Sequence, residues 1–171
     1  MGNIMDYIEW RGDLPFTQSE FNDVDNLILA CFSYVNLDGI QEAASQNGIE
    51  LKALTEKFLQ LHTEKELKED KSFIRFAPFM MLEMAKTERF GQCVIRNYVN
   101  EIVAEEAQQF SAVEICLSDG TSYISFRGTD DTIVGWKEDF NLSTGVVPAQ
   151  ERAVEYLRRI AGSLQEMVRV G

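Results

Sequence analysis

Basic residues, long apolar runs and paired cysteines are all scarce in this sequence. Lys and Arg number 16 against 28 Asp and Glu, which gives a net charge of -12. A surface of that sign repels phosphate backbones and anionic lipids, so nucleic acid is not an expected partner. No window approaches the roughly 20 apolar residues that a transmembrane helix needs. The N-terminus carries Asp6, Glu9 and Asp13 and lacks the basic and apolar regions of a signal peptide, so we expect a cytoplasmic protein.

The few cysteines and the single histidine limit the chemistry further. Cys31, Cys93 and Cys116 are odd in number and widely spaced, which is typical of buried free thiols in a reducing compartment. His62 is the only histidine, so a metal site with several histidine ligands is not available. The sequence therefore predicts neither a metal nor another cofactor.

Composition favours one folded domain over residues 1–171. Apolar residues make up 45% and charged residues 26%, and only three prolines are present, which argues against long disordered linkers. Residues 1–91 are predicted to be mainly helical, and residues 92–171 to form a β-hairpin, a loop, a helix and the start of a further strand. This order predicts an α/β fold in which N-terminal helices precede an incomplete mixed or parallel sheet.

Apolar residues at helical spacing define the expected helices. Gly12, Asp13 and Pro15 are predicted to form a loop that leads into a first helix, with Ser19 as its N-cap. A second helix is expected over residues 51–61, continuing into the polar run from Thr63 to Lys71, and a third from Ala77 to about Arg89. The third helix is rich in methionine, and residues 79–84 fit either ordinary core filling or an adaptable groove for an acyl chain.

The second half of the chain has the alternating apolar pattern of β-strands. Apolar residues alternate from Phe110 to Ser118 and again from Thr121 to Phe126, with Asp119-Gly120 between the two runs. Asp-Gly in this setting predicts a hairpin with a two-residue type I′ turn. An amphipathic helix is expected from Pro148, followed by an apolar strand from Met167 to Val170.

The loop after the second hairpin strand carries the candidate chemistry. Arg127, Gly128 and Thr129 follow the carboxyl end of that strand, where open α/β sheets bind their ligands. Gly128 allows a sharp turn. Thr129 can offer its N–H and hydroxyl to a carbonyl oxygen that becomes negative during acyl transfer, which is the role of an oxyanion hole.

The residues that follow are suited to supporting this loop. A short helix is expected there, and its candidate N-caps are Asp130, Asp131 and Thr132. Trp136 and Asp139 would share one face of the helix, from which Asp139 can pair with Arg127. A strand, a tight turn and a salt-bridged helix explain the same residues without any reaction, so the motif by itself leaves a purely structural interpretation open.

The segment Phe126-Arg127-Gly128-Thr129, followed by residues 135–140, resembles the oxyanion-loop region of class 3 lipases, which have the α/β-hydrolase fold. It is more similar still to the Mbeg-like proteins, a bacterial family of unknown function related to those lipases. Further similarities lie at residues 6–7, 10–13, 21–29 and 109–112. The resemblance covers essentially the whole chain, as the N-terminal portion of such a protein.

The resemblance implies a serine hydrolase that acts on esters or acyl lipids. Thr129 matches the oxyanion-hole position, and the loop-supporting residues would be Arg127, Gly128, Asp130, Trp136 and Asp139. The family's nucleophile elbow, Gly-His-Ser-x-Gly-Gly, would follow the strand that ends at residues 168–171, and the triad acid and histidine come later still. Because this sequence contains none of these three groups, the 171 residues are predicted to be inactive by themselves.

Two functions remain open at this point. The first is the N-terminal portion of a lipase-like or esterase-like hydrolase, whose substrate in the parent protein is a small acyl ester or a lipid. The second is a non-enzymatic binding or assembly module. In that case the strand from Met167 to Val170 is an open edge that pairs with a second copy or with a C-terminal portion.

Overall fold

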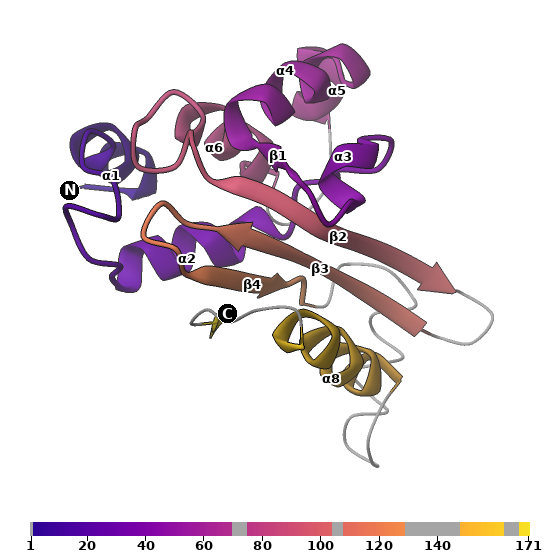
Figure 1. The fold of residues 1–171 in the computed structure, drawn as a ribbon. Coiled ribbons are helices and arrows are strands. Elements are labelled where there is room, and N and C mark those ends of the chain that lie inside the picture. Colours follow the sequence, from indigo (N-terminus) through magenta and orange to yellow (C-terminus); the bar gives the residue numbers. More distant parts are fainter. Residues whose placement is uncertain (1, 70–74, 104–107, 129–147, 163–167) are drawn as a thin grey trace.

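The computed structural model describes residues 2–69, 75–103, 108–128, 148–162 and 168–171. Its centre is a five-stranded sheet in the order β1-β2-β3-β4-β5 (Figure 1). The strands are β1 (Ile49–Glu50), β2 (Val94–Val103), β3 (Gln108–Cys116), β4 (Ser122–Phe126) and β5 (Val168–Val170). The helices are α1 (Ile4–Arg11), α2 (Asp23–Phe32), α3 (Gln41–Ala44), α4 (Leu51–Leu61), α5 (Glu64–Glu69), α6 (Ala77–Met84) and α8 (Pro148–Ala161). The predicted combination of helices with a mixed sheet is confirmed.

The sheet contains both strand orientations. Pairing is antiparallel from β1 through β4, whereas β4 and β5 are parallel, with Ser122 opposite Val168 and Ile124 opposite Val170. A parallel pair needs a crossover connection, and α8 lies in the segment that joins these two strands. Strands β4 and β5 therefore point their carboxyl ends to the same edge of the sheet.

Side-chain alternation along β3 divides the core between the two faces of the sheet. Val113 and Ile115 lie in one apolar cluster with residues of α1, α2 and α6. Phe110 and Ala112 lie in a second cluster with Tyr156 of α8. Figure 1 shows α8 apart from the other helices, across the sheet from α2. The protein thus has a helical layer on each face, and the N-terminal layer is the larger.

Helix α1 occupies a segment for which the sequence analysis predicted no helix. Asn3 caps the helix because its side-chain oxygen accepts hydrogen bonds from the amides of Met5 (2.8 Å) and Asp6 (3.2 Å). The Asp6 carboxylate in turn accepts from the Asn3 amide at 2.8 Å, which completes a capping box. Ile8, 1% exposed, fixes the helix against the core. The sequence analysis missed this helix because it gave no weight to the Asn3 cap, whereas the predicted loop at Gly12, Asp13 and Pro15 follows the helix and is confirmed.

Helix α2 begins later than predicted. Its N-cap is Asn22, whose side chain accepts from the amides of Val24 and Asp25 at 2.9 and 3.3 Å, and the Asp25 carboxylate accepts from the Asn22 amide at 3.0 Å. Ser19, the predicted cap, has another role, since its hydroxyl accepts a hydrogen bond from Arg11 Nη2 at 3.0 Å. Asn22 is placed to form a reciprocal capping box with Asp25, whereas Ser19 is tied to α1.

The hairpin between β3 and β4 is confirmed, but its turn differs from the expected one. The Gly120 amide donates to the Leu117 oxygen at 3.1 Å, and the Leu117 amide donates to the Thr121 oxygen at 2.8 Å. The loop therefore has three residues, Ser118 to Gly120, and only Gly120 has a positive φ, of 83°. A type I′ turn would require Asp119 to have a positive φ as well, so glycine at the third loop position gives the three-residue solution.

Helices α4 and α6 test the two remaining helix predictions. The range of α4 is as predicted, but the polar run after it forms the separate helix α5. Helix α6 ends at Met84, short of Arg89, because the amides of Lys86 and Thr87 turn back to oxygens three residues earlier. Met80, Met81 and Met84 are at most 1% exposed and belong to the main core. The core-filling interpretation is confirmed, and the acyl-groove interpretation of these methionines is wrong.

The Arg89 side chain ties the segment between α1 and α2 to the core at several points. The Arg89 guanidinium donates to the main-chain oxygens of Leu14 at 2.8 Å, Ser19 at 3.0 Å and Glu20 at 3.1 Å. The Arg89 amide also donates to the Gly12 oxygen at 2.9 Å. Buried main-chain oxygens need such donors, so Arg89 helps to hold the connection between the two helices in place, together with the buried Phe16 ring.

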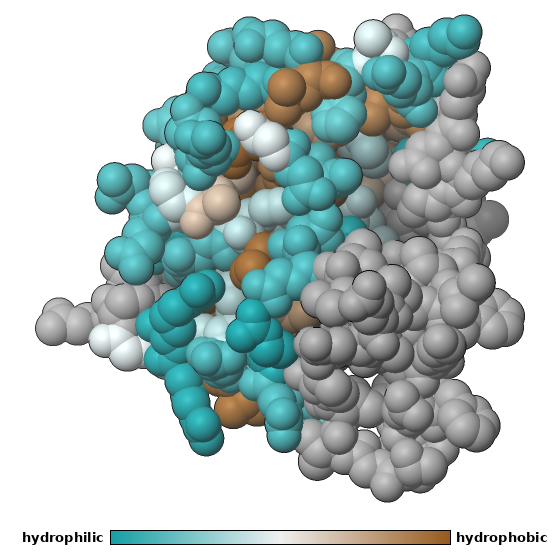
Figure 2. Space-filling model, turned by 90° about the vertical axis from the view of Figure 1, so that its right-hand side faces the viewer, coloured by the Kyte–Doolittle hydropathy of each residue, from teal (hydrophilic) through white to brown (hydrophobic). Residues whose placement is uncertain are grey.

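The surface and the thiols agree with the composition. Figure 2 shows a face that is mostly hydrophilic over the described residues, with apolar side chains in separate patches. None of the helices in the described part of the chain has the length and apolar character needed to cross a bilayer. Cys31, Cys93 and Cys116 are free thiols, the first two are buried, and burial raises the pKa of both. These two fit the predicted role as packing residues.

Candidate functional site

The carboxyl ends of β4 and β5 are joined by main-chain hydrogen bonds. The Gly171 amide donates to the Ile124 oxygen at 3.0 Å, and the Phe126 amide donates to the Gly171 oxygen at 3.1 Å. The loop that starts at Arg127 and the end of β5 are therefore immediate neighbours. This edge is the position at which the sequence predicts an acyl-transfer site.

Arg127 lies at this edge and is directed across the sheet. Its amide donates to the Ser111 oxygen at 2.9 Å, which extends the β3–β4 ladder by one residue beyond Phe126. Its Nη2 donates to Asn100 Oδ1 on β2 at 2.7 Å. Its Nε is buried and has no hydrogen-bond partner among the described residues. Arg127 thus connects the predicted oxyanion loop to a strand two positions away in the sheet.

Asn100 continues this connection to the loop after α2. Its Nδ2 donates to Asp38 Oδ2 at 2.8 Å, and the Tyr98 hydroxyl donates to the other oxygen of the same carboxylate at 3.3 Å. Burial, together with the negative charge of Asp38, raises the pKa of Tyr98. A hollow of about 270 Å³ beside this network is lined by residues 37–41, Ala44 and residues 98–101. Asn100 therefore lies between the loop arginine and a small surface hollow.

Gly128 is exposed, and the C-terminal end of α2 lies close to it. A Cβ atom at Gly128 would lie 3.1 Å from the Tyr34 hydroxyl, which is tight but not forbidden. Ser33 contacts the end of β4, since its hydroxyl lies 3.3 Å from the Phe126 oxygen, and the same hydroxyl lies 2.8 Å from the Ala30 oxygen. The start of the loop is thus packed against the N-terminal helical layer.

The predicted site residues divide into two groups. Arg127 and Gly128 lie at the expected edge of the sheet. Thr129, Asp130, Trp136 and Asp139 lie outside the described residues, so the oxyanion-hole role and the pairing of Asp139 with Arg127 stay predictions. Asn100 was missed by the sequence analysis. No local pattern identifies it, because it reaches Arg127 only through the register that sets Asn100 opposite Ser111.

A second polar cluster lies inside the sheet, on the face that carries α8. The Glu114 carboxylate is fully buried and accepts from Arg96 Nη2 at 2.9 Å, Asn97 Nδ2 at 2.7 Å and Ser122 Oγ at 2.8 Å. Burial opposes the charged form of Glu114, but the three hydrogen bonds outweigh it and lower its pKa. Asn97, with φ of 54°, lies where the pairing of β2 with β3 shifts its register. This cluster stabilises a bulge and is closed to a substrate.

Two features of the described residues concern catalytic chemistry: the potential metal ligands and His62. No group of three or more His, Cys, Asp or Glu side chains there is arranged to hold a metal ion. The His62 ring packs 4.5 Å from the Phe58 ring at the end of α4, and its Nε2 is buried without a hydrogen-bond partner in that part of the chain. His62 is therefore partly a packing residue.

A family model described as Mbeg1-like matches residues 84–171, just over half of the chain. The chain belongs to the Mbeg1-like family. The Mbeg1-like range contains β2 to β5, α8 and the loop after Phe126, so it covers the whole candidate edge. The sequence similarities at residues 6–29 lie outside it. Comparison with curated proteins and with solved structures gave no match.

Proposed function

We propose that this chain is the N-terminal part of a serine hydrolase that cleaves acyl esters, of the lipase or esterase type within the α/β-hydrolase fold. In this proposal Thr129 supplies its N–H and hydroxyl to the oxyanion, while Arg127 and Gly128 shape the loop that carries it. The nucleophile belongs to polypeptide that follows Gly171. The 171 residues alone are expected to be inactive.

The parallel pairing of β4 with β5 is the observation that carries this proposal. A residue that follows Gly171 starts beside Arg127, because the Gly171 oxygen is already bonded to the Phe126 amide. In α/β-hydrolases the nucleophile lies on a sharp turn after a strand, and part of the oxyanion hole comes from a loop on a neighbouring strand. Because β4 and β5 are parallel neighbours, the loop that carries the oxyanion donor and the turn that carries the nucleophile would start side by side.

Hydrolysis of a nitrophenyl ester tests the proposal. The 171-residue chain should give no rate above background, whereas a polypeptide extended through the Gly-His-Ser elbow and the later acid and histidine should turn over. Replacing the elbow serine by alanine in the extended polypeptide should abolish that rate. Equal activity of the short and extended chains would refute the assignment of the nucleophile.

Thr129 can be tested in the same extended polypeptide. T129V removes the hydroxyl, and loss of one oxyanion donor typically lowers kcat about 100- to 1000-fold. T121V is the matched control, since it makes the same change in the hairpin turn at the other end of β4, where the Thr121 hydroxyl donates to Asp119 Oδ1 at 2.6 Å, and it should retain activity. If the two variants have equal kcat, Thr129 does not serve the oxyanion.

A second candidate function, assembly through the sheet edge, is favoured by the exposure of β5. Val170 is 54% exposed, and among the described strands β5 pairs only with β4. An unpaired strand edge is a template for another strand. Light scattering over a range of concentrations tests this function, since strand pairing between copies requires a concentration-dependent rise in mass, and a constant monomer mass would exclude it.

A further inference from the structure

The Tyr123 side chain joins the start of α2 to the end of β5. Tyr123 lies on β4 and is fully buried, and its hydroxyl lies 2.8 Å from Asn26 Oδ1 and 3.1 Å from the Asn26 main-chain oxygen. Both contacts are to residue 26 in the first turns of α2. A buried phenol with two acceptors on one residue is held in a fixed position.

The Tyr123 hydroxyl also leaves no space for a side chain at position 171. A Cβ atom added to Gly171 would lie 1.8 Å from Tyr123 Oη, 2.7 Å from Tyr123 Cζ and 3.1 Å from Asn26 Oδ1. Because the phenol is buried and hydrogen-bonded to Asn26, it cannot move aside at low cost. The glycine is therefore required here by close approach of a side chain.

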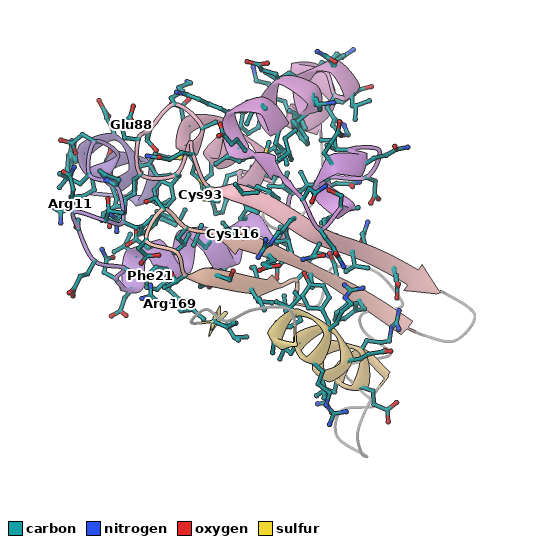
Figure 3. The ribbon with its side chains drawn as sticks, viewed as in Figure 1. Arg11, Phe21, Glu88, Cys93, Cys116 and Arg169 are labelled. Atoms are coloured by element: carbon teal, nitrogen blue, oxygen red, sulfur yellow. The ribbon has the colours of Figure 1, made fainter. Side chains whose placement is uncertain are left out.

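A third contact holds β5 at the same place. The Arg169 guanidinium lies 4.5 Å from the centre of the Phe21 ring, and that ring lies 5.8 Å from the ring of Tyr123. Figure 3 shows Phe21 and Arg169 next to each other between the start of α2 and β5. Cation–π and aromatic contacts thus add to the hydrogen bonds of Tyr123.

We propose that Tyr123 and Asn26 are positioning residues that fix the carboxyl end of β5 through Gly171, and so fix where the residue after Gly171 begins. The N-terminal segment around Asn26 thereby acquires a role in the site although it touches no substrate. Its effect on catalysis rests on the proposed function, whereas its effect on the end of β5 does not.

Amide hydrogen exchange on the 171-residue chain tests the structural part of this proposal, that Tyr123 and Asn26 fix the end of β5. The Phe126 amide, bonded to the Gly171 oxygen, reports directly on the end of β5. In Y123F and N26A its exchange should quicken roughly fivefold relative to amides of the β2–β3 pair, as expected for loss of one hydrogen bond. Y156F is the matched control, because Tyr156 is a buried tyrosine that donates to the Asn97 oxygen at 2.9 Å, and it should leave Phe126 unchanged.

A double-mutant cycle makes the test specific. G171A should quicken Phe126 exchange in the wild-type background, and its effect should be smaller in the Y123F background, where the clashing oxygen is absent. N26A covers the case in which Y123F fails to fold, since alanine is well tolerated in a helix. An equal effect of G171A in both backgrounds, or unchanged exchange in N26A, would overturn the proposal.

The catalytic half is measured on the extended polypeptide. Y123F and N26A should lower kcat about tenfold with KM unchanged, because a misplaced nucleophile affects the reaction and not substrate binding. Y156F should keep the wild-type kcat. If the extended polypeptide is inactive, the proposed hydrolase function fails while the exchange results still decide the positioning role. If it is active and kcat is unchanged in both variants, the positioning role in catalysis fails.

Discussion

Arg89 and Asp25 form a bidentate ion pair in which both side chains are fully buried. Arg89 Nε and Nη2 donate to the two Asp25 oxygens at 2.9 and 2.5 Å. The same carboxylate accepts from the Tyr7 hydroxyl at 3.1 Å, and the guanidinium lies 4.0 Å from the centre of the Phe16 ring. Each charge is therefore fully hydrogen-bonded, which is the condition under which a buried pair is tolerated.

Removing one member of this pair should be strongly destabilising. R89M leaves the Asp25 carboxylate buried without its partner, so we expect a loss of about 3–5 kcal/mol in the free energy of unfolding. K86M breaks the exposed pair with Glu83 and should cost less than about 1 kcal/mol. Urea unfolding measures both. Similar losses in the two variants would contradict the structural role of Arg89.

Glu114 should make stability dependent on acid pH. Burial raises the pKa of this carboxyl and the hydrogen bonds from Arg96, Asn97 and Ser122 lower it, with a net lowering from 4.5. A depressed folded-state pKa contributes stability above the unfolded-state pKa and loses it as pH falls through the folded-state value. The stability advantage of wild type over E114Q should therefore be full at neutral pH and shrink below about pH 4.5. Urea unfolding of the two proteins across that range is the measurement, and a constant difference would disprove it.

Buried tyrosines should make the protein labile in alkali. Burial raises the pKa of Tyr123 from 10.0 to about 12, and it also raises the pKa of Tyr98 and Tyr156. A raised folded-state pKa gives stability that is present below the unfolded-state pKa and is lost as pH rises. Thermal stability should therefore fall between about pH 10 and pH 12, in step with phenolate absorbance. Y123F should weaken this dependence. The prediction fails if all tyrosines titrate near the free-phenol value in the folded protein.

The methionines of α6 should behave as core residues. M80A removes a side chain that is 0% exposed, so we expect a loss of about 2–5 kcal/mol through lost burial and a residual cavity. M5A is the control, because Met5 is 37% exposed, and its effect should stay within about 0.5 kcal/mol. Thermal or urea unfolding distinguishes the two. A small effect of M80A would return the acyl-groove interpretation to consideration.

The sequence predicted those elements whose pattern is local. Helix α4, the start of α8 and the β3–β4 hairpin all follow from apolar periodicity or from a turn residue. It missed α1 and misplaced the start of α2, because several Asn, Ser and Asp residues near each start can cap a helix. Tertiary contacts made the choice, since Ser19 is tied to Arg11 and Arg89, and Asn22 caps the helix in a capping box with Asp25.

For the candidate site, the sequence by itself determined that Arg127 and Gly128 follow a strand end and that a further strand lies near residues 168–170. Only the tertiary structure decided that β5 lies parallel to β4, that Asn100 holds Arg127, and that Tyr123 leaves room for nothing larger than glycine at position 171. The reason is physical. Periodicity and turn chemistry act between near neighbours, whereas strand order and cross-sheet contacts arise from the packing of segments that lie far apart in the chain.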